Sequence, residues 1–403
     1  MRNFIYAITL FETHIFFSFS SFLGIQFEED EGAGPVYKSY CILIFILAMA
    51  TFIRGENLIG WGRARRAGIA LCVLLIYLII GIVTGYAGDI SFLEFGAFCI
   101  PACCIGIYYS NEGAISRMIK WFDPIFLFIS FSLIFNIKGM IDFNGGIYSQ
   151  KLSYYAAMCF LLDIFLLNMG KNQGRFPFFR KKIVYCFYII LLPLFVAVSL
   201  FSGGRGGFVT IVLGFCAFLV FGGENKYRII RGIGMVGMIY LILLISFISY
   251  IGIDLLELFQ NNAGRVFSYL QGGKLDVSET SGRDAVYGYT LELIKSNPLI
   301  GYGIFGYKKF LMESQGVAFP HNLFLEWLLQ GGVILFSIYT IVFSRFCVLT
   351  WKLLKRDTNQ VLLLPLLIYP FTELMFSSSY MEEPLFWFTM VYVLMREPLF
   401  VAT

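Results

Sequence analysis

The sequence predicts an all-α polytopic membrane protein with about twelve transmembrane helices and one large outer loop. Composition is the first reason: 58% of the residues are hydrophobic and 14% are charged, whereas a soluble domain has about a quarter charged residues. The second reason is that the apolar residues gather into runs of roughly 15 to 25, long enough to cross a bilayer as helices. A water-soluble core of this size could not hide 45 phenylalanines and 24 tyrosines, so soluble protein classes are excluded.

The predicted spans follow the apolar runs in chain order. They lie near residues 4–27, 36–53, 67–87, 92–109, 124–138, 152–169, 183–202, 207–222, 232–253, 322–349, 361–376 and 384–398. The first run contains Glu12 and His14 and lacks a small-residue cleavage site, so we interpret it as a span and not as a signal peptide. The two halves of the chain lack the matched Gly- or Pro-interrupted spans that inverted-repeat transporters tend to show.

Orientation follows from the basic residues of the connecting loops. Of the 30 lysines and arginines, 20 fall on one side of the predicted membrane and 10 on the other, and six of these ten lie in one long loop. The positive-inside rule therefore places both termini in the cytoplasm and the long loop outside. The predicted domains are residues 1–253 with nine spans, 254–320 as an outer cap, and 321–403 with three spans.

The long loop has the pattern of folded structure, because it contains apolar periodicity. A capping-box sequence at Ser281–Asp284 predicts the start of a helix, and Asn297-Pro298 predicts its end. The apolar face of this helix consists of Val286, Tyr289 and Leu293. We expect the loop to contain short amphipathic helices that form a cap at the outer membrane surface.

Two sequence features resemble metal or nucleotide sites but are better explained otherwise. The acidic run Glu28–Glu31 in the first outer loop is more typical of a solvated loop than of a divalent metal site. Gly301–Gly306 matches G-x-G-x-x-G, yet it follows a helix-ending Asn-Pro and not a strand. We predict that it forms a tight turn whose backbone approaches another group closely. All nine cysteines fall in apolar runs, so no disulfide framework or zinc site is predicted.

Two arginines on the outer face are candidates for binding an anion. Arg205 lies in the turn Ser202–Gly207 with four glycines around it. That turn fits equally well a membrane hairpin whose arginine reaches the headgroups, or a bare backbone that approaches phosphate oxygens. Arg283 opens the loop helix, where a single arginine is most often solvated. Together the two guanidinium groups can hold one diphosphate, at about 1.5–3 kcal/mol per charged hydrogen bond.

His321 is the candidate base. It lies between Pro320 and Asn322 at the predicted start of a long apolar helix, where backbone N–H groups are unpaired. Asn322, Glu326 and Gln330 follow at intervals of four and form a polar stripe on one helix face. We interpret Gln330 as a structural residue that forms hydrogen bonds between helices. For His321, the near-neutral pKa of imidazole and the outer position favour a functional role over a single interfacial hydrogen bond.

Two further ionisable residues lie within predicted spans. His14 is in the middle of the first span with Glu12, and a structural polar pair is the favoured interpretation. Glu373, near the outer end of the eleventh span, is a secondary candidate for the site that contains His321.

The order of these motifs resembles the superfamily of O-antigen polymerases and O-antigen ligases. The matching pieces are Ser202–Gly206, Arg283 with Tyr287, Pro298–Gly303, and His321-Asn322 with Gly331-Gly332. Two positions depart from the family pattern: Gly204 stands where serine is frequent, and Tyr287 stands where tryptophan is common. Neither departure removes a charged or titrating group. The resemblance covers mainly residues 200–335, and the rest of the chain matches in hydropathy and number of spans.

The resemblance implies a GT-C-like, metal-independent membrane glycosyltransferase with no cofactor. Its arginines matching Arg205 and Arg283 would hold the diphosphate, and the histidine matching His321 would position or deprotonate the attacking hydroxyl. The predicted substrate-binding residues are Arg205, Arg283, Asn322, Gly204, Gly206 and Glu373. Implied partners are an undecaprenyl-diphosphate-linked donor and acceptor, membrane lipid and a chain-length-determinant co-polymerase, with no nucleic acid. The expected location is the bacterial inner membrane, with the active site facing the periplasm.

We favour a polymerase among three functions that such a chain can have. A ligase would transfer the same donor to the lipid A core, so only acceptor tests separate the two. A lipid-linked-oligosaccharide flippase would also have about twelve spans, but it needs charges at mid-depth and short loops on both sides. This sequence instead concentrates its unusual polar residues at the outer face, beside a large loop.

Overall fold

The protein is described by a computed structural model that covers most of the chain. The described residues are 2–22, 35–54, 73, 75–84, 95–112, 115–119, 121–140, 150–173, 182–201, 205–222, 226–251, 283–356 and 358–396. All regular structure among them is helical, which confirms the predicted all-α class.

Most of the described helices coincide with predicted spans. They are α3 (Pro35–Ile53), α6 (Ile100–Glu112), α8 (Phe122–Met140), α9 (Gln150–Gln173), α10 (Lys182–Phe201), α11 (Arg205–Phe221), α12 (Lys226–Ile251), α17 (Leu323–Arg356), α18 (Leu363–Phe376) and α19 (Pro384–Met395). The first predicted span is divided at Phe11 into α1 (Arg2–Leu10) and α2 (Glu12–Phe22). Shorter elements are α7 (Ile115–Ile119), η1 (Phe95–Cys99), η5 (Thr358–Leu362) and η6 (Tyr380–Glu382).

Length and hydropathy identify two described helices that can cross a membrane by themselves. These are Pro35–Ile53 and Leu323–Arg356, and further apolar helices of 10–17 residues accompany them. The helical architecture and the apolar composition agree with a membrane protein. The number of twelve spans stays a prediction.

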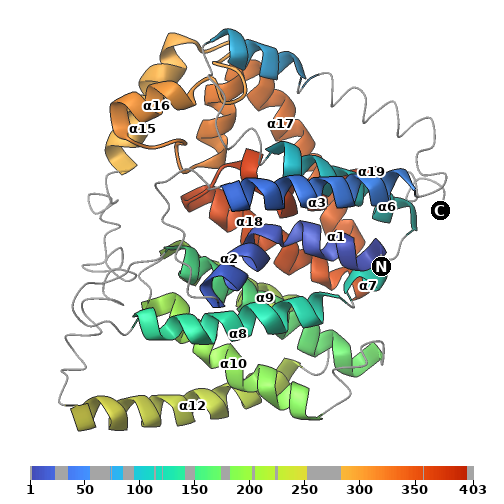
Figure 1. Ribbon diagram of the computed structural model, residues 1–403, viewed down its shortest axis with the longest axis vertical. Coiled ribbons are helices and arrows are strands. Elements are labelled where there is room, and N and C mark those ends of the chain that lie inside the picture. Colours follow the sequence, from blue (N-terminus) through green and yellow to red (C-terminus); the bar gives the residue numbers. More distant parts are fainter. Residues whose placement is uncertain are drawn as a thin grey trace.

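The largest core surrounds α9. Its residues Leu161, Ile164 and Phe165 have no exposed surface, and α9 packs against α8, α10, α11 and α18. A helix that is apolar all round is expected in such a central position. Gly214 lets α11 approach, because a Cβ atom there would come within 2.5 Å of the Leu161 side chain. In Figure 1, α12 lies at one end of the long axis, and α15 (Arg283–Ser296), α16 (Lys308–Gln315) and α17 lie at the other.

His14 makes its contact with a distant helix. Its Nε2 atom lies 2.8 Å from the hydroxyl of Tyr369 on α18, and its ring lies beside Tyr155 on α9, with centroids 4.5 Å apart. The buried histidine therefore joins three helices. The structural interpretation of His14 agrees with this contact, but its Nε2 atom is bonded to Tyr369 and not to Glu12.

The cap helix α15 matches its prediction closely. It begins at Arg283 and ends at Ser296, immediately before Asn297-Pro298. Val286 and Leu293 are buried on its inner face. Tyr289 packs against the hydrophobic cluster that contains Leu293. The preceding residues of the predicted capping box, Ser281 and Gly282, lie outside the described residues.

The helix α17 is not continuous, contrary to the single span predicted for residues 322–349. Gly332 has φ 55° and ψ −161°, which interrupts the helix between a short part, 323–331, and a long part, 333–356. Backbone groups freed by this break bond to the segment after α15: Gly303 N–H donates to the Gln330 carbonyl at 2.7 Å, and Val333 N–H donates to the Pro298 carbonyl at 2.8 Å. A break inside an apolar region is tolerated when other backbone satisfies its polar groups.

The G-x-G-x-x-G segment is the element that fills this break, which confirms the interpretation as a tight turn. Gly301 and Gly303 have φ of 71° and 77°, conformations that favour glycine. A Cβ atom at Gly303 would lie 2.0 Å from the backbone nitrogen of Gly81. Next to it, the Ile304 N–H donates to the Tyr77 carbonyl at 2.9 Å. The turn therefore holds α17 against the helical stretch 75–83.

Candidate functional site

Four segments that are distant in sequence meet at one end of α18. They are the start of α11 with Arg205, the start of α15 with Arg283, the loop before α17 with His321, and the end of α18 with Glu373. The starts of α11 and α15 both contact α18 near this end, and His321 is connected to α15. The structure thus brings together most of the residues that the sequence nominated.

Arg283 is anchored to the end of α18. Its Nη2 atom donates a hydrogen bond to the Phe376 carbonyl at 2.8 Å, and its guanidinium lies over the Phe376 ring, 6.0 Å from the centroid. The side chain is half-buried. A guanidinium has five N–H donors in a fixed fork, so this anchor leaves the group suited to bind an anion as well.

His321 lies beside Arg283 in a strained backbone conformation. Its φ is 52°, an unusual value for a non-glycine residue. The imidazole packs edge-on against Phe319 with ring centroids 4.8 Å apart, and the Tyr287 hydroxyl donates to the His321 carbonyl at 3.5 Å. The Nδ1 atom is buried and has no hydrogen-bond partner among the described residues.

Electrostatics keep this imidazole neutral. Burial, and then the positive charge of Arg283, lower the pKa of His321 from its ordinary 6.5 to about 4. The neutral ring is the form that can accept a proton, so His321 is in its basic form at neutral pH. Arg283 is the charged group that contributes to this lowered pKa.

A titration of the two histidines tests this arrangement. We expect the His321 imidazole to titrate with a pKa of about 4, and we expect Arg283→Gln to raise that pKa because a positive neighbour is removed. The measurement is NMR of the ¹⁵N-labelled imidazoles in detergent; the sequence has only two histidines, and a His14→Gln variant assigns the signals. An unperturbed pKa near 6.5, or no shift in Arg283→Gln, would contradict the proximity of the two groups.

Arg205 begins α11, and the glycines after it have a packing role. A Cβ atom at Gly206 would lie 1.8 Å from the Tyr154 hydroxyl, and one at Gly207 would lie 2.2 Å from the Ser153 hydroxyl. Both glycines therefore allow the first turn of α11 to lie directly on α9. Helix packing therefore accounts for these two glycines, and an approach of this backbone to phosphate stays a prediction. Gly204 lies outside the described residues.

Two hydroxyl contacts tie α11 and α9 to α18. The Ser377 hydroxyl donates to the Tyr154 hydroxyl at 3.1 Å, and the hydroxyls of Thr210 and Thr372 lie 2.5 Å apart. Ser377 directly follows Phe376, the residue that anchors Arg283. The start of α11 and the guanidinium of Arg283 are therefore attached to the same short stretch of chain.

Glu373 lies on the last turn of α18. Its carbonyl accepts hydrogen bonds from the N–H groups of Ser377 at 2.7 Å and Ser378 at 3.1 Å, which shape the turn that carries the Arg283 anchor. Its carboxyl group is close to the buried Glu383: burial, and then the Glu373 charge, raise the pKa of Glu383 well above its usual range. Glu373 thus shapes the turn that anchors Arg283 and belongs to a pair of carboxyl groups; its contact with substrate stays a prediction.

Asn322 is the cap of α17. Its Oδ1 atom accepts hydrogen bonds from the N–H groups of Phe324 at 3.0 Å and Leu325 at 3.2 Å. This arrangement satisfies donors at the helix start and fixes the helix beside His321. The structure shows this capping role of Asn322. The binding of substrate by Asn322 stays a prediction.

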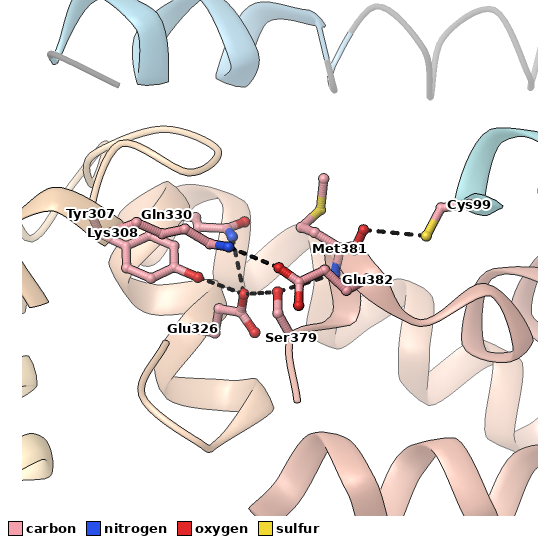
Figure 2. Close-up of polar contacts among 8 residues, drawn as sticks. All are labelled: Cys99, Tyr307, Lys308, Glu326, Gln330, Ser379, Met381 and Glu382. Carbon is pink, nitrogen blue, oxygen red and sulfur yellow. Dashed lines mark hydrogen bonds and ion pairs between the residues drawn. The ribbon is translucent and has the colours of Figure 1, made fainter. Parts of the chain in front are cut away.

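One turn further along α17, a buried polar cluster joins α17 to the cap and to the connection before α19 (Figure 2). Oε1 of Glu326 accepts hydrogen bonds from the Tyr307 hydroxyl at 2.7 Å and the Ser379 hydroxyl at 2.5 Å. Gln330 accepts a hydrogen bond from the Tyr380 hydroxyl, which confirms that Gln330 links separate segments. The remaining contacts drawn are Lys308 to Glu382, Gln330 to Glu326, the Met381 N–H to the Ser379 hydroxyl, and the Cys99 thiol to the Met381 carbonyl.

Most of this cluster is not apparent from the sequence. The spacing of four identified Glu326 and Gln330, but nothing in the local sequence marks Tyr307, Lys308 or Ser379. Lys308 is the most informative, because its side chain is only 3% exposed and its Nζ lies 2.8 Å from Glu382 Oε1.

Lys308 gives a stability prediction. We expect Lys308→Met to destabilise the protein by about 3–5 kcal/mol, because it leaves the Glu382 carboxylate without its partner in a largely buried position. The neighbouring Lys309 is 58% exposed, so Lys309→Met should cost less than about 1 kcal/mol. Both values are measurable by unfolding in mixed detergent. Equal effects of the two variants, or no recovery in Lys308→Met/Glu382→Met, would contradict the buried ion pair.

No metal site is built into the described part of the chain. Among those residues, no three His, Cys, Asp or Glu side chains are grouped so as to hold a metal ion. The acidic run 28–31 lies outside them.

Comparison with known families agrees with the sequence motifs. Residues 189–340 match the family model described as O-antigen ligase, and this match confirms the predicted resemblance to the O-antigen polymerase and ligase superfamily. The matched region includes Arg205, Arg283 and His321. It supports a glycosyltransferase-like enzyme of polysaccharide synthesis in a membrane. No curated protein and no solved structure gave a significant match.

Proposed function

From the match of residues 189–340 to the O-antigen ligase family, we propose that this protein is a surface-polysaccharide polymerase. It transfers a growing glycan from undecaprenyl diphosphate to the non-reducing end of a new lipid-linked repeat unit. The observation that carries the proposal is the placement of a neutral imidazole, His321, within electrostatic range of the anchored Arg283. A base beside an anion-binding group is what a transfer from a diphosphate requires.

The transfer breaks one bond and forms another. The acceptor hydroxyl oxygen attacks the anomeric carbon of the donor, and the bond from that carbon to the diphosphate oxygen breaks. The electron pair of that bond leaves with the lipid diphosphate, whose growing charge Arg283 and Arg205 stabilise. The hydroxyl proton passes to His321 at Nε2, because its other ring nitrogen, Nδ1, is buried.

Donor binding makes the base stronger. In the structure, Arg283 is one of the two causes that lower the pKa of His321. A bound diphosphate is an anion beside Arg283, so it offsets this positive charge and raises the pKa of His321. The imidazole therefore becomes a better proton acceptor when the donor is in place, which limits proton transfer to the loaded enzyme.

Topology and partners complete the proposal. The site faces the periplasm at the outer leaflet of a bacterial inner membrane, and both termini are cytoplasmic, in accord with the distribution of basic residues. The substrates are a lipid-linked oligosaccharide donor and a lipid-linked acceptor, and a chain-length-determinant co-polymerase sets product length. The arginines neutralise the leaving group, so no metal ion is required.

A ligase is the second candidate, and one observation favours it: the matched family model is described as O-antigen ligase. In that case the same donor is transferred to the lipid A core. A flippase is disfavoured because Arg283, His321 and Glu373 gather at one end of the helices and not at their middle.

One assay separates these functions. Purified protein in detergent is given a synthetic lipid-diphosphate repeat unit and EDTA, and the products are resolved on a gel. A ladder of repeats supports a metal-independent polymerase. Transfer that appears only after lipid A core is added supports the ligase. Absence of both reactions, with transport in proteoliposomes, would support the flippase and overturn the proposal.

A further inference from the structure

Tyr154 lies between the two elements that carry the arginines. It is on α9 and only 2% exposed. On one side, Gly206 is so close that a Cβ atom there would lie 1.8 Å from the Tyr154 hydroxyl. On the other side, this hydroxyl accepts a hydrogen bond from Ser377 at 3.1 Å. One phenol group therefore contacts both the start of α11 and the turn after α18.

Each of these contacts is one residue away from an arginine or its anchor. Gly206 directly follows Arg205, the first residue of α11. Ser377 directly follows Phe376, whose carbonyl accepts the hydrogen bond from Arg283 at 2.8 Å. Tyr154 thus contacts the residue that follows Arg205 and the residue that follows the backbone anchor of Arg283.

Hydrogen bonds around Tyr154 hold the turn after α18 and the start of α11 in place. The Ser377 N–H donates to the Glu373 carbonyl at 2.7 Å, which fixes the turn. Thr210 on α11 and Thr372 on α18 lie 2.5 Å apart through their hydroxyls, about one helical turn from Gly206 and Ser377 respectively. The hydroxyl of Tyr154 thus lies between the start of α11 and a turn that is itself held in place.

We propose that Tyr154 is a positioning residue that sets the separation of Arg205 and Arg283, so that the pair selects a diphosphate over a single phosphate. The inference rests on the proposed function, because it concerns the same anion. Two guanidinium groups engage two linked phosphates only when their spacing fits, and small displacements of binding groups carry large costs. A single phosphate needs only one guanidinium and is insensitive to the spacing.

The test compares two inorganic inhibitors of the purified enzyme, pyrophosphate and orthophosphate. Tyr154→Phe removes the hydroxyl that Ser377 bonds, and we expect pyrophosphate inhibition to weaken about tenfold while orthophosphate inhibition stays within about twofold. Ser377→Ala should have the same selective effect, and the double variant should add little to either. The matched control is Tyr155→Phe, because Tyr155 is adjacent in sequence but packs against His14.

Each outcome decides the matter. Selective loss of pyrophosphate inhibition in Tyr154→Phe and Ser377→Ala supports the inference. Equal weakening of both inhibitors indicates general damage and overturns it, as does an unchanged pyrophosphate constant. A wild-type enzyme that pyrophosphate does not inhibit overturns the diphosphate site of the proposed function itself.

Discussion

Replacing His321 is expected to lower the rate of polymer formation by about 10²–10⁴-fold, the usual contribution of a positioned base. The reason is that His321 is neutral, close to Arg283 and at the start of α17, where the acceptor hydroxyl would be deprotonated. The measurement is the initial rate of repeat addition with a saturating donor, with product ladders as a second readout.

The choice of replacement matters because His321 has φ 52°. Alanine is disfavoured at positive φ, whereas asparagine tolerates it. His321→Asn therefore removes the imidazole with little backbone strain, and His321→Ala adds strain to the same loss. We expect both variants to lose activity, with thermal stability lowered more in His321→Ala. A fully active His321→Asn enzyme would show that the imidazole is not the base.

Replacing Arg283 with alanine is expected to lower the rate by about 10²–10³-fold, the usual effect of losing one preorganised donor to a developing charge. Arg283→Lys keeps the charge but not the planar fork, so it should retain part of the activity. The rate and the donor concentration dependence are both measured, since a loss in kcat distinguishes stabilisation of the leaving group from simple donor binding.

Lys295 provides the matched control for Arg283. It lies in the last turn of the same helix, α15, and is exposed. Lys295→Ala removes a positive charge from α15 without touching the anchor at Phe376, and its rate should be close to that of the wild type. A similar loss in both variants would indicate a general effect of charge in the cap. Unchanged polymer from Arg283→Ala would remove Arg283 from the site.

The parts of the fold set by local chemistry were predictable from the sequence. The cap helix α15 is the best example, because its end before Asn297-Pro298 follows from a proline signal within the segment itself. The apolar runs likewise placed most helices within a few residues. The order of Arg205, Arg283 and His321 was enough to nominate a site.

The features that depend on distant contacts were not predictable. Gly331-Gly332 within an apolar run is compatible with a continuous helix, and only the arrival of Gly303 beside Gln330 explains why the helix breaks. The packing role of Gly206 was not predictable either, because the sequence does not show that Tyr154 occupies that side of the glycine. Both cases have the same cause: a glycine marks a close approach without identifying the partner.

The filled break in α17 has a consequence for building chimaeras between related enzymes. The cap segment 298–306 supplies backbone partners for α17 around Gly332, so the two are one structural cassette. A transplanted loop that ends at residue 320 would lack α17, whose Leu329 and Gln330 carbonyls accept hydrogen bonds from the segment 298–306. Exchanges of acceptor or donor preference should therefore move residues 283–335 together, with the junctions placed outside both.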